Sequence, residues 1–391
     1  MATTNSQATD DDAVMSDVKN FIDGQYRESA GARTFDNINP CTGAVIGRVH
    51  EASQEDVDAA VQAARAALRG PWGSLSEAQR GEMLHAVAQG IERRFDEFLA
   101  AECADTGKPR SMASQIDIPR GAANFRVFAD AVKNISTEAF RTATPDGKGA
   151  FNVAVRKPKG VIAVISPWNL PLLLMTWKVG PALACGNTVV VKPSEETPTT
   201  TSLLGEVMNE VGVPPGVFNV VNGFGPKSAG EFLTEHPGVD AITFTGETRT
   251  GEIITQAAAK GLRDVSMECG GKNPALVFAD CDMDKAIEGT LRSAFANCGQ
   301  VCLGTERVFV QRPVFDEFVA RLAREAGRFR LGVPEDGSTD MGPLVSHEHQ
   351  RKVLSYYQLA VEEGAEVILG GGVPEMPAEL AGGAWIQPTI W

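Results

Sequence analysis

Val161-Ile162-Ala163-Val164-Ile165-Ser166-Pro167-Trp168-Asn169 is an apolar run that ends abruptly in polar residues, and it decides the fold. Three similar short runs, rich in β-branched residues, follow at residues 188–191, 217–221 and 241–245. The segments that separate them have helical features and span residues 171–185, 197–211, 226–233 and 248–258. Strands that are apolar on both faces are typical of a parallel sheet covered by helices. The alternation therefore predicts an α/β fold built on a Rossmann-like parallel sheet.

Each of these four runs ends in a distinctive group of residues. The groups are Pro167-Trp168-Asn169, Lys192-Pro193-Ser194-Glu195, Gly223-Phe224-Gly225 and Thr245-Gly246-Glu247. In open parallel sheets, ligands bind in the crevice beyond the carboxyl ends of the strands. A single glycine in such a place is usually only a turn. Four polar or glycine-rich ends that face one crevice instead indicate a nucleotide-binding site.

The chain before this sheet is predicted to contain short strands and then helices. Residues 21–49 have the composition of strands, with turn signals at Asp23-Gly24 and Thr42-Gly43. Ser53 and Asp56 resemble a capping box at the start of a helix. Further helices are expected at residues 83–91, 95–99 and 124–132, and residues 151–156 alternate as in an exposed strand or an arm between subunits. Residues 1–17 are polar and acidic, which predicts a disordered tail.

A second series of strands and helices is expected to begin near residue 264. A strand at residues 265–267 leads into Glu268-Cys269-Gly270-Gly271-Lys272, and a helix at residues 283–295 leads into Asn297-Cys298-Gly299-Gln300-Val301-Cys302. Further strands are expected at residues 275–278, 308–310 and 366–369, and further helices at residues 315–329 and 346–363. The apolar residues 385–391 also have the pattern of a strand. This second unit would present Cys302 on a turn between packed elements.

Cys302 is the candidate nucleophile. Cysteine is the strongest side-chain nucleophile near neutral pH when its thiolate is populated. Taken alone, Cys302 would more often be a small buried hydrophobic residue. The complementary residues upstream, Asn169 and Glu268 together with the glycines at the strand ends, favour a catalytic role instead. Cys298 is expected to be packed rather than reactive.

Composition narrows the possible partners. The 391 residues include 36 Lys and Arg against 50 Asp and Glu, which gives a formal charge of −14. That balance argues against a nucleic-acid or anionic-membrane partner, and no apolar run approaches the roughly 18 residues of a membrane span. Seven cysteines without CxxC spacing indicate reduced thiols, and five scattered histidines predict no metal site. The first residues lack the pattern of a signal peptide, so we expect a cytoplasmic protein.

Taken together, the motifs resemble one family closely, the NAD(P)-dependent aldehyde dehydrogenases. The matching residues, in the family's order and spacing, are Pro167-Trp168-Asn169, Lys192-Pro193-Ser194-Glu195, Phe244-Thr245-Gly246, Glu268-Cys269-Gly270-Gly271-Lys272 and Gly299-Gln300-Val301-Cys302. The resemblance covers about residue 20 to the end of the chain. Within the family, residues 168–177 and 295–307 look like the 2-hydroxymuconic and 2-aminomuconic semialdehyde dehydrogenases of aromatic-compound catabolism.

The resemblance also implies a domain organisation. It places an NAD-binding domain at residues 18–140 and 161–267, an oligomerisation arm at residues 141–160, and a catalytic domain at residues 268–391. It implies a homodimer or a homotetramer. The C-terminal part of the family pattern is missing, which leaves open a shortened, non-catalytic dinucleotide-binding chain. Another non-acylating aldehyde dehydrogenase also stays open, whereas Glu268 argues against a CoA-acylating enzyme, because CoA-using relatives generally lack that base.

Three residues take catalytic roles on the family pattern. Cys302 would attack the aldehyde to form a thiohemiacetal, and loss of hydride would leave a thioester. The side-chain amide of Asn169 and the backbone N–H of Cys302 would stabilise the oxyanion. Glu268 would be the base that activates water for hydrolysis of the thioester, in a site that is closed to solvent.

NAD is the cofactor that the resemblance implies. Glu195 would accept the adenosine ribose hydroxyls and repel the 2′-phosphate of NADP, and Lys192 would donate to the same ribose. Gly225 and Gly246 would let the adenine and the pyrophosphate approach the backbone, the latter at a helix N-terminus. Glu247 stands where the family commonly has serine, and an anion there is unfavourable unless it points away from the phosphates. The full predicted cofactor-binding set is Lys192, Glu195, Gly225, Gly246, Trp168 and Thr248.

The substrate implied is an aldehyde that carries a carboxylate, so its pocket should hold a cation. Arg120 is the candidate, because Pro119 places it near a helix start and its surroundings resemble the semialdehyde subfamily. A surface arginine paired with Asp117 is the simpler alternative. Trp177 and Leu303 would line the pocket, although plain core packing would equally explain them. The sequence does not distinguish a 2-hydroxy from a 2-amino substrate.

Overall fold

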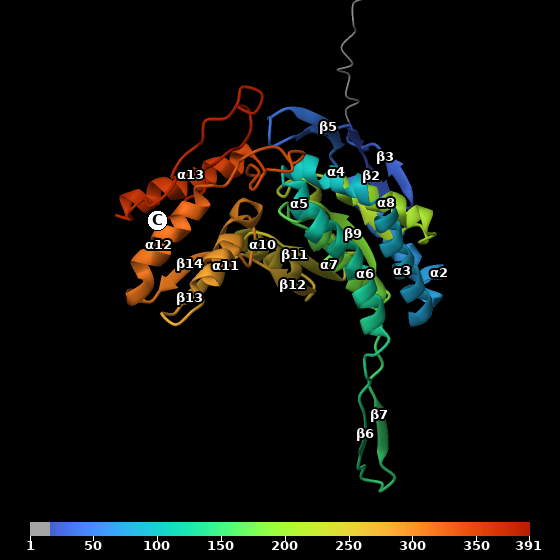
Figure 1. Ribbon diagram of the computed structural model, residues 1–391. Helices are drawn as coiled ribbons and strands as arrows, with labels where there is room; N and C mark the ends of the chain where they lie inside the picture. The colour runs from blue at the N-terminus through green and yellow to red at the C-terminus, as the bar shows by residue number, and fades with distance from the viewer. Residues whose placement is uncertain (1–15) are drawn as a thin grey trace, which may run out of the picture.

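A seven-stranded sheet forms the centre of the protein, for which a computed structural model describes residues 16–391 (Figure 1). The strand order is β12-β11-β8-β9-β10-β2-β3. Its first five strands are mutually parallel, and the predicted parallel sheet is confirmed. They are β8 (Val161–Ile165), β9 (Thr188–Lys192), β10 (Phe218–Val220), β11 (Ala241–Thr245) and β12 (Asp264–Glu268). The antiparallel hairpin of β2 (Asn20–Ile22) and β3 (Gln25–Arg27) completes the sheet.

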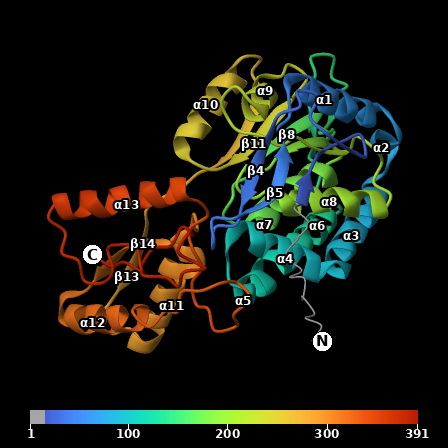
Figure 2. The ribbon, with the colours of Figure 1, turned by 90° about the horizontal axis from the view of Figure 1, so that it is seen from above.

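Helices cover both faces of this sheet, because successive side chains of a strand point to opposite faces. Val161, Ala163 and Ile165 of β8 belong to a core shared with α1 (Gln54–Arg69), α9 (Ala229–Glu235) and α10 (Thr248–Ala259). Ile162 and Val164 belong to the core on the other face. The helices on that face are α3 (Glu77–Arg93), α4 (Phe95–Thr106), α6 (Ile118–Val132), α7 (Pro171–Ala184) and α8 (Thr199–Glu210). Figure 2 shows the two groups of helices on either side of the strands.

The N-terminal residues form a small sheet of their own beside this core. Its order is β1-β5-β4, made of β1 (Ser16–Val18), β4 (Thr34–Ile38) and β5 (Val45–His50). The predicted disordered tail is therefore wrong at its end, since Asp17 pairs with Arg48 in the parallel ladder of β1 and β5. Residues 1–15 of that predicted tail lie outside the described residues. The predicted capping box is confirmed, because the Ser53 and Asp56 side chains each accept from the other residue's backbone N–H at the start of α1.

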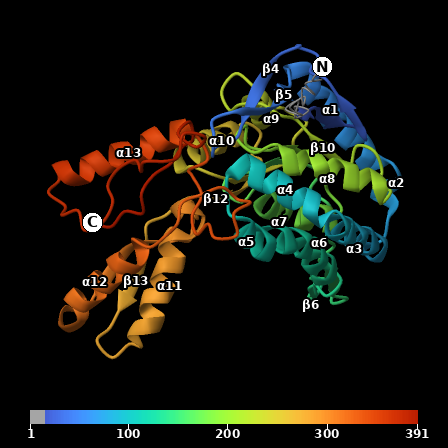
Figure 3. The same cartoon turned by 45° about the horizontal axis from the view of Figure 1, so that its top comes forward.

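A second lobe carries the C-terminal third of the chain (Figures 1 and 3). The parallel strands β13 (Asn273–Val277) and β14 (Thr305–Val310) pack on α11 (Met283–Phe295) and α12 (Phe315–Ala326), and α13 (His347–Glu362) follows. The second series was predicted to begin near residue 264, but β12 is the edge strand of the large sheet, so the new unit starts at β13. Glu268, the last residue of β12, thus stands at the junction of the two lobes.

Two predicted C-terminal strands are wrong. Residues 366–369 and 385–391 form only one isolated bridge, between Leu369 and Ile390. The reason lies in Trp385, whose buried ring is held by hydrogen bonds from Nε1 to Cys41 O at 3.1 Å and to Leu380 O at 2.8 Å. The residues around Trp385 therefore pack as a loop against the N-terminal part of the chain.

An antiparallel ribbon projects from the body of the protein at the bottom of Figure 1. It consists of β6 (Ala139–Thr142) and β7 (Ala150–Val153), so the exposed strand predicted near residues 151–156 is confirmed. Phe140, Phe151 and Val153 on this ribbon are all about half exposed or more. The remaining short elements are α2 (Pro71–Ser74), α5 (Arg110–Met112), a π-helical turn (Ala113–Asp117) and 3₁₀ turns (Ala296–Gly299 and Arg312–Val314). Among residues 16–391, no helix is both long and apolar enough to cross a bilayer.

Candidate active site

Asn169 lies just beyond β8, and its side chain reaches the turn that carries Cys302. Asn169 Nδ2 donates to Gln300 O at 2.8 Å, and Asn169 O accepts from Asn297 Nδ2 at 2.9 Å. These bonds tie the end of a sheet strand to the turn after α11, more than a hundred residues later in the chain. Because an amide nitrogen carries two hydrogens, the second N–H of Asn169 is left for an oxyanion.

The turn before Cys302 has an uncommon backbone conformation. Asn297 and Cys298 have φ angles of 52° and 57°, in the left-handed region that residues other than glycine seldom adopt. Such strain persists only where the surroundings hold it, and it is frequent at active sites. On the far side of the nucleophile, Asn273 Nδ2 donates to Cys302 O at 2.9 Å and to Gly304 O at 3.0 Å. The backbone of Cys302 is thus fixed on both sides.

The two cysteines of this turn differ in their surroundings. Cys298 packs against the buried cluster of Leu344 and Ile386, and burial raises the pKa of its thiol to about 12. Cys302 is exposed. Since the thiolate is the reactive form, Cys302 is the accessible candidate nucleophile and Cys298 is a packing residue.

Glu268 lies beside the end of β11, where Thr245 is its neighbour in register and Gly246 N donates to Glu268 O at 3.1 Å. It lines a cavity of about 500 Å³ together with Trp177 and Lys178. Burial lowers the pKa of Lys178 to about 8, against the attraction of the Glu268 carboxylate. The cavity therefore brings a candidate base together with a buried amine and one of the two predicted pocket residues.

The closed site predicted from the sequence is wrong for residues 16–391. Cys302 and Glu268 are both exposed, and the cavity beside Glu268 is lined by neither Cys302 nor Leu303. Leu303 is 76% exposed, and Leu276 and Phe309 of the adjacent strands are 64% and 54% exposed. The physical reason is that α11 and α12 cover only one face of the two-stranded sheet.

The end of β9 presents an ion pair to the crevice. Lys192 Nζ lies 2.9 Å from Glu195 Oε2, and the Lys192 side chain is buried. Burial raises the pKa of Glu195, but the attraction and hydrogen bond of Lys192 outweigh this effect and hold the pKa below its ordinary value. Glu195 is therefore an anion at the place where the sequence predicts the ribose.

The two predicted glycines differ in their surroundings. A Cβ on Gly246 would lie 2.5 Å from the ring of Phe244, so packing within the chain already requires this glycine. A Cβ on Gly225 would meet nothing within 4 Å, which leaves open space at that turn. Thr248 begins α10, whose N-terminus has no side-chain cap, so its N–H groups are available to an anion.

Glu247 does not face the N-terminus of α10 as a free anion. Its carboxylate accepts from Lys352 Nζ of α13 at 2.7 Å, and this hydrogen bond lowers the pKa of Glu247. The unfavourable charge beside a predicted pyrophosphate is therefore balanced by a lysine of the second lobe. Figures 2 and 3 show α13 reaching across toward α10.

Trp168, Trp177 and Arg120 are the remaining predicted site residues. The ring of Trp168 contacts the ring of His349 of α13 in a tilted arrangement, with 4.8 Å between ring centroids. Trp177 is 45% exposed and packs edge-on against Phe128, so the core-packing alternative describes it only in part. Arg120 is exposed in the first turn of α6, and its charge acts on the buried Asp117.

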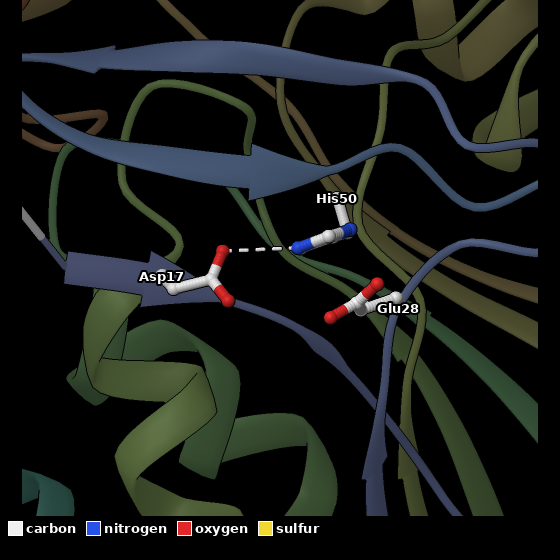
Figure 4. A group of neighbouring side chains, drawn as sticks. All are labelled: Asp17, Glu28 and His50. Carbon is white, nitrogen blue, oxygen red and sulfur yellow. Dashed lines mark hydrogen bonds and ion pairs between the residues drawn. The ribbon is translucent and has the colours of Figure 1, made fainter.

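One group of described residues has the composition of a metal site. Asp17, Glu28 and His50 lie together beside β1 and β5, and His50 Nε2 is 2.9 Å from Asp17 Oδ1 (Figure 4). Lys19 Nζ, however, lies 3.1 Å from Glu28 Oε1 and 3.4 Å from Asp17 Oδ2. The lysine supplies the positive charge that the carboxylates need, so an ion-pair cluster explains this group.

Several polar residues in these contacts had no role in the sequence analysis. Gln300 stands inside a matching motif, Asn297 lies in the run 295–307 that resembles the semialdehyde dehydrogenases, and Asn273 directly follows Lys272, so each position carried a signal. Lys178 is the one charged residue in the apolar helix α7, which was a signal as well. Lys108, whose ammonium donates to Asn169 O at 3.1 Å, gave none, because a lysine after a helix is normally a solvated surface residue.

Comparison with known proteins supplies independent observations. A sequence model of the aldehyde dehydrogenase family matches residues 26–391. A 2-hydroxymuconic semialdehyde dehydrogenase of Pseudomonas sp. (strain CF600) is 71% identical over 96% of this chain and 78% of that protein. A 2-aminomuconic 6-semialdehyde dehydrogenase of Pseudomonas sp. is 55% identical over 96% of this chain and 76% of that protein. The NAD⁺ complex of an aldehyde dehydrogenase from Bacillus cereus superposes with a TM-score of 0.91 at 36% identity, over 99% of this chain and 77% of that one.

Proposed function

The chain belongs to the aldehyde dehydrogenase family, and we propose that it uses NAD to oxidise a carboxylated semialdehyde, of the 2-hydroxymuconate or 2-aminomuconate type, to the acid. Family membership makes it an NAD-dependent oxidoreductase that acts on an aldehyde. The observation that carries the proposal is the hydrogen bond from Asn169 Nδ2 to Gln300 O, two residues before Cys302. It joins a candidate oxyanion donor to the turn of an exposed candidate nucleophile.

The proposed reaction uses three side chains of the chain itself. The Cys302 thiolate attacks the aldehyde carbon, and the carbonyl oxygen becomes an oxyanion that the free N–H of Asn169 and the backbone N–H of Cys302 stabilise. Bound NAD would supply the acceptor for the hydride that leaves this carbon. Glu268 then removes a proton from a water molecule, which attacks the resulting thioester, releases the acid and restores the thiol.

The residues at the strand ends fit a dinucleotide. Glu195 and Lys192 offer an acceptor and a donor to a ribose, the space at Gly225 is open, and the N-terminus of α10 offers free N–H groups. Lys352 balances Glu247 beside that N-terminus. These features support Lys192, Glu195, Gly225, Gly246, Trp168 and Thr248 as the cofactor-binding set.

We expect NAD to be preferred to NADP because of Glu195. A 2′-phosphate would meet its carboxylate, and like charges a few ångströms apart at a protein surface repel by about 1–4 kcal/mol. Glu195→Gln should therefore shift the ratio of kcat/KM for NADP over NAD upward by about tenfold, measured as NAD(P)H formation. An unchanged ratio would show that other residues select the cofactor.

The substrate class is tested by one assay of this chain with NAD and a panel of aldehydes. The panel should contain 2-hydroxymuconate semialdehyde, 2-aminomuconate semialdehyde, and uncharged aldehydes of similar length, with NADH followed by absorbance. The proposal requires the highest kcat/KM for a carboxylated semialdehyde. A preference for uncharged aldehydes would indicate another non-acylating dehydrogenase, and absence of turnover would refute the proposal.

Arg120 is proposed to bind the substrate carboxylate. It is exposed at the start of α6, and a guanidinium matches a carboxylate with two parallel hydrogen bonds. A hydrogen bond to a charged group contributes about 1.5–3 kcal/mol, so Arg120→Ala should lower kcat/KM for a carboxylated semialdehyde roughly 10- to 150-fold. For an uncharged aldehyde the loss should be small. Equal losses for both substrates would mean that Arg120 only stabilises the buried Asp117 carboxylate and does not bind the substrate.

We also propose that the protein is a homodimer or homotetramer joined through the ribbon of β6 and β7. The exposed Phe140, Phe151 and Val153 on this projecting element support the proposal, because apolar side chains on such an arm are typical of an interface. Its molar mass in solution, measured by light scattering, tests this, and a single-chain mass would exclude it.

A further inference from the structure

Lys108 is a fully buried charged side chain near the candidate oxyanion donor. It follows α4, after the left-handed Gly107 that ends the helix, and its side chain is 0% exposed. An ammonium group is buried in this way only when it is paired and hydrogen-bonded, because removing it from water is costly. The partners of Lys108 therefore indicate what the burial achieves.

Three acceptors surround the Lys108 ammonium. Lys108 Nζ donates to Asp117 Oδ2 at 2.7 Å and to the backbone oxygen of Asn169 at 3.1 Å. Glu102 Oε1 lies 3.6 Å away, and both carboxylates are fully buried. The ammonium thus joins two elements outside the sheet, α4 and the π-helical turn (Ala113–Asp117), to the strand end that carries Asn169.

The contact with Asn169 bears on the candidate oxyanion site. Asn169 O accepts from both Lys108 Nζ and Asn297 Nδ2, which occupies both of its lone pairs. Asn169 Nδ2 donates to Gln300 O, whereas Asn169 Oδ1 is buried and has no hydrogen-bond partner among residues 16–391. The side-chain amide is therefore oriented by a single bond, and its position depends on where the backbone of Asn169 is held.

The carboxylates around Lys108 act on its neighbours as well. Glu102 Oε2 accepts from the backbone N–H of Leu172 at 3.3 Å, in the first turn of α7. Burial raises the pKa of Glu102 and so favours its neutral acid. The positive charge of Lys108 acts in the opposite direction but is the smaller effect. Burial raises the pKa of Asp117 as well, but Asp117 Oδ2 lies 2.7 Å from Lys108 Nζ against 3.6 Å for Glu102 Oε1, so Asp117 is the nearer counter-ion of the ammonium.

We propose that Lys108 is a positioning residue of the oxidation: its buried ammonium fixes the backbone of Asn169, so that the Asn169 amide stabilises the oxyanion formed when Cys302 attacks the aldehyde. This rests on the proposed function of Asn169 and extends it. Lys108 acts through Asn169 and touches neither substrate nor cofactor. Its effect therefore belongs to the rate of the covalent step, and NAD affinity should be independent of it.

The test is the rate of the first NADH burst, measured by stopped flow in the full chain with saturating NAD and semialdehyde. Asn169→Ala should slow the burst by about 10²–10³-fold, because one oxyanion donor is lost. Lys108→Met should slow it by at least about tenfold while the dissociation constant for NAD stays within about twofold. Glu102→Gln is the matched control, since it alters the same buried group but keeps the bond from Lys108 to Asn169, and its burst rate should stay within about twofold.

Lys108→Met leaves Asp117 buried without its cation and can fail to fold for that reason. The combination of Lys108→Met, Asp117→Asn and Glu102→Gln removes every charge of the group together, and we expect it to fold and to show the same slow burst. Circular dichroism and the thermal midpoint establish folding. A folded variant without Lys108 that keeps the wild-type burst rate would overturn the proposal.

A double-mutant cycle distinguishes an effect of Lys108 that acts through Asn169 from a general loss of structural stability. In the background of Asn169→Ala, Lys108→Met should slow the burst by less than about twofold more, because the side chain that it positions is gone. Multiplicative losses would overturn the inference and show that Lys108 supports the fold at large. An undiminished burst in Asn169→Ala alone would instead refute the proposed role of Asn169, which is a different result and concerns the proposed function itself.

Discussion

Cys302→Ala should abolish dehydrogenase activity and leave NAD binding nearly unchanged. The thiol is the only side chain in the proposed reaction that forms a bond to the aldehyde carbon, and alanine has no nucleophile to replace it. Nothing in the strand-end set for NAD depends on this side chain. We expect steady-state turnover to fall to background, at least about 10⁴-fold below the wild type. NADH absorbance measures the first effect, and a calorimetric titration with NAD measures the second.

Cys298→Ala is the matched control, four residues earlier in the same turn. Its thiol packs against a buried cluster, and burial keeps it protonated, so the variant should retain most of the activity after correction for folded protein. Iodoacetamide should also modify Cys302 before Cys298, since Cys302 is exposed. An inactive Cys298→Ala beside an active Cys302→Ala would reverse the assignment of the nucleophile.

Glu268→Ala should still produce one burst of NADH and then stall. Hydride transfer precedes hydrolysis in the proposed reaction, so loss of the base that activates water leaves the chain as a thioester on Cys302. General-base catalysis contributes about 10²–10⁴-fold, and the steady-state rate should fall by that factor. Stopped-flow absorbance should show a burst close to one NADH per site, and mass spectrometry should find the acyl group on the peptide that contains Cys302.

The shape of this result distinguishes two roles of Glu268. If NAD binds but no burst forms, Glu268 acts before hydride transfer, as the base for Cys302. If the steady-state rate is normal, Glu268 has no part in the chemistry. Glu268→Gln is a useful companion, because it keeps the size and the place at the end of β12 while removing the basic carboxylate.

The sequence by itself determined the parallel sheet and the set of candidate residues at its edge. The apolar runs around residues 161–165 and 241–245 could be buried only as central strands, because a strand that is apolar on both faces needs cover on both. The carboxyl ends of parallel strands lie along one edge of the sheet, so Asn169, Glu195 and Gly246 could be placed at a common crevice from their position in the chain. The matching motifs then assigned the family without any coordinates.

The tertiary structure decided which of these groups meet and what supports them. Asn169 is bonded to the turn of Cys302 by residues from another lobe, and no periodicity in the sequence encodes a contact across that distance. Glu247 is balanced by Lys352, and Gly246 is required by the ring of Phe244, whereas the sequence suggested cofactor chemistry for both positions. Lys108 carried no signal at all, since its meaning lies in the partners that folding places around it. The local sequence shows which faces of a strand must be buried. The energy of a buried charge, by contrast, depends on groups that only the folded chain brings within hydrogen-bonding distance.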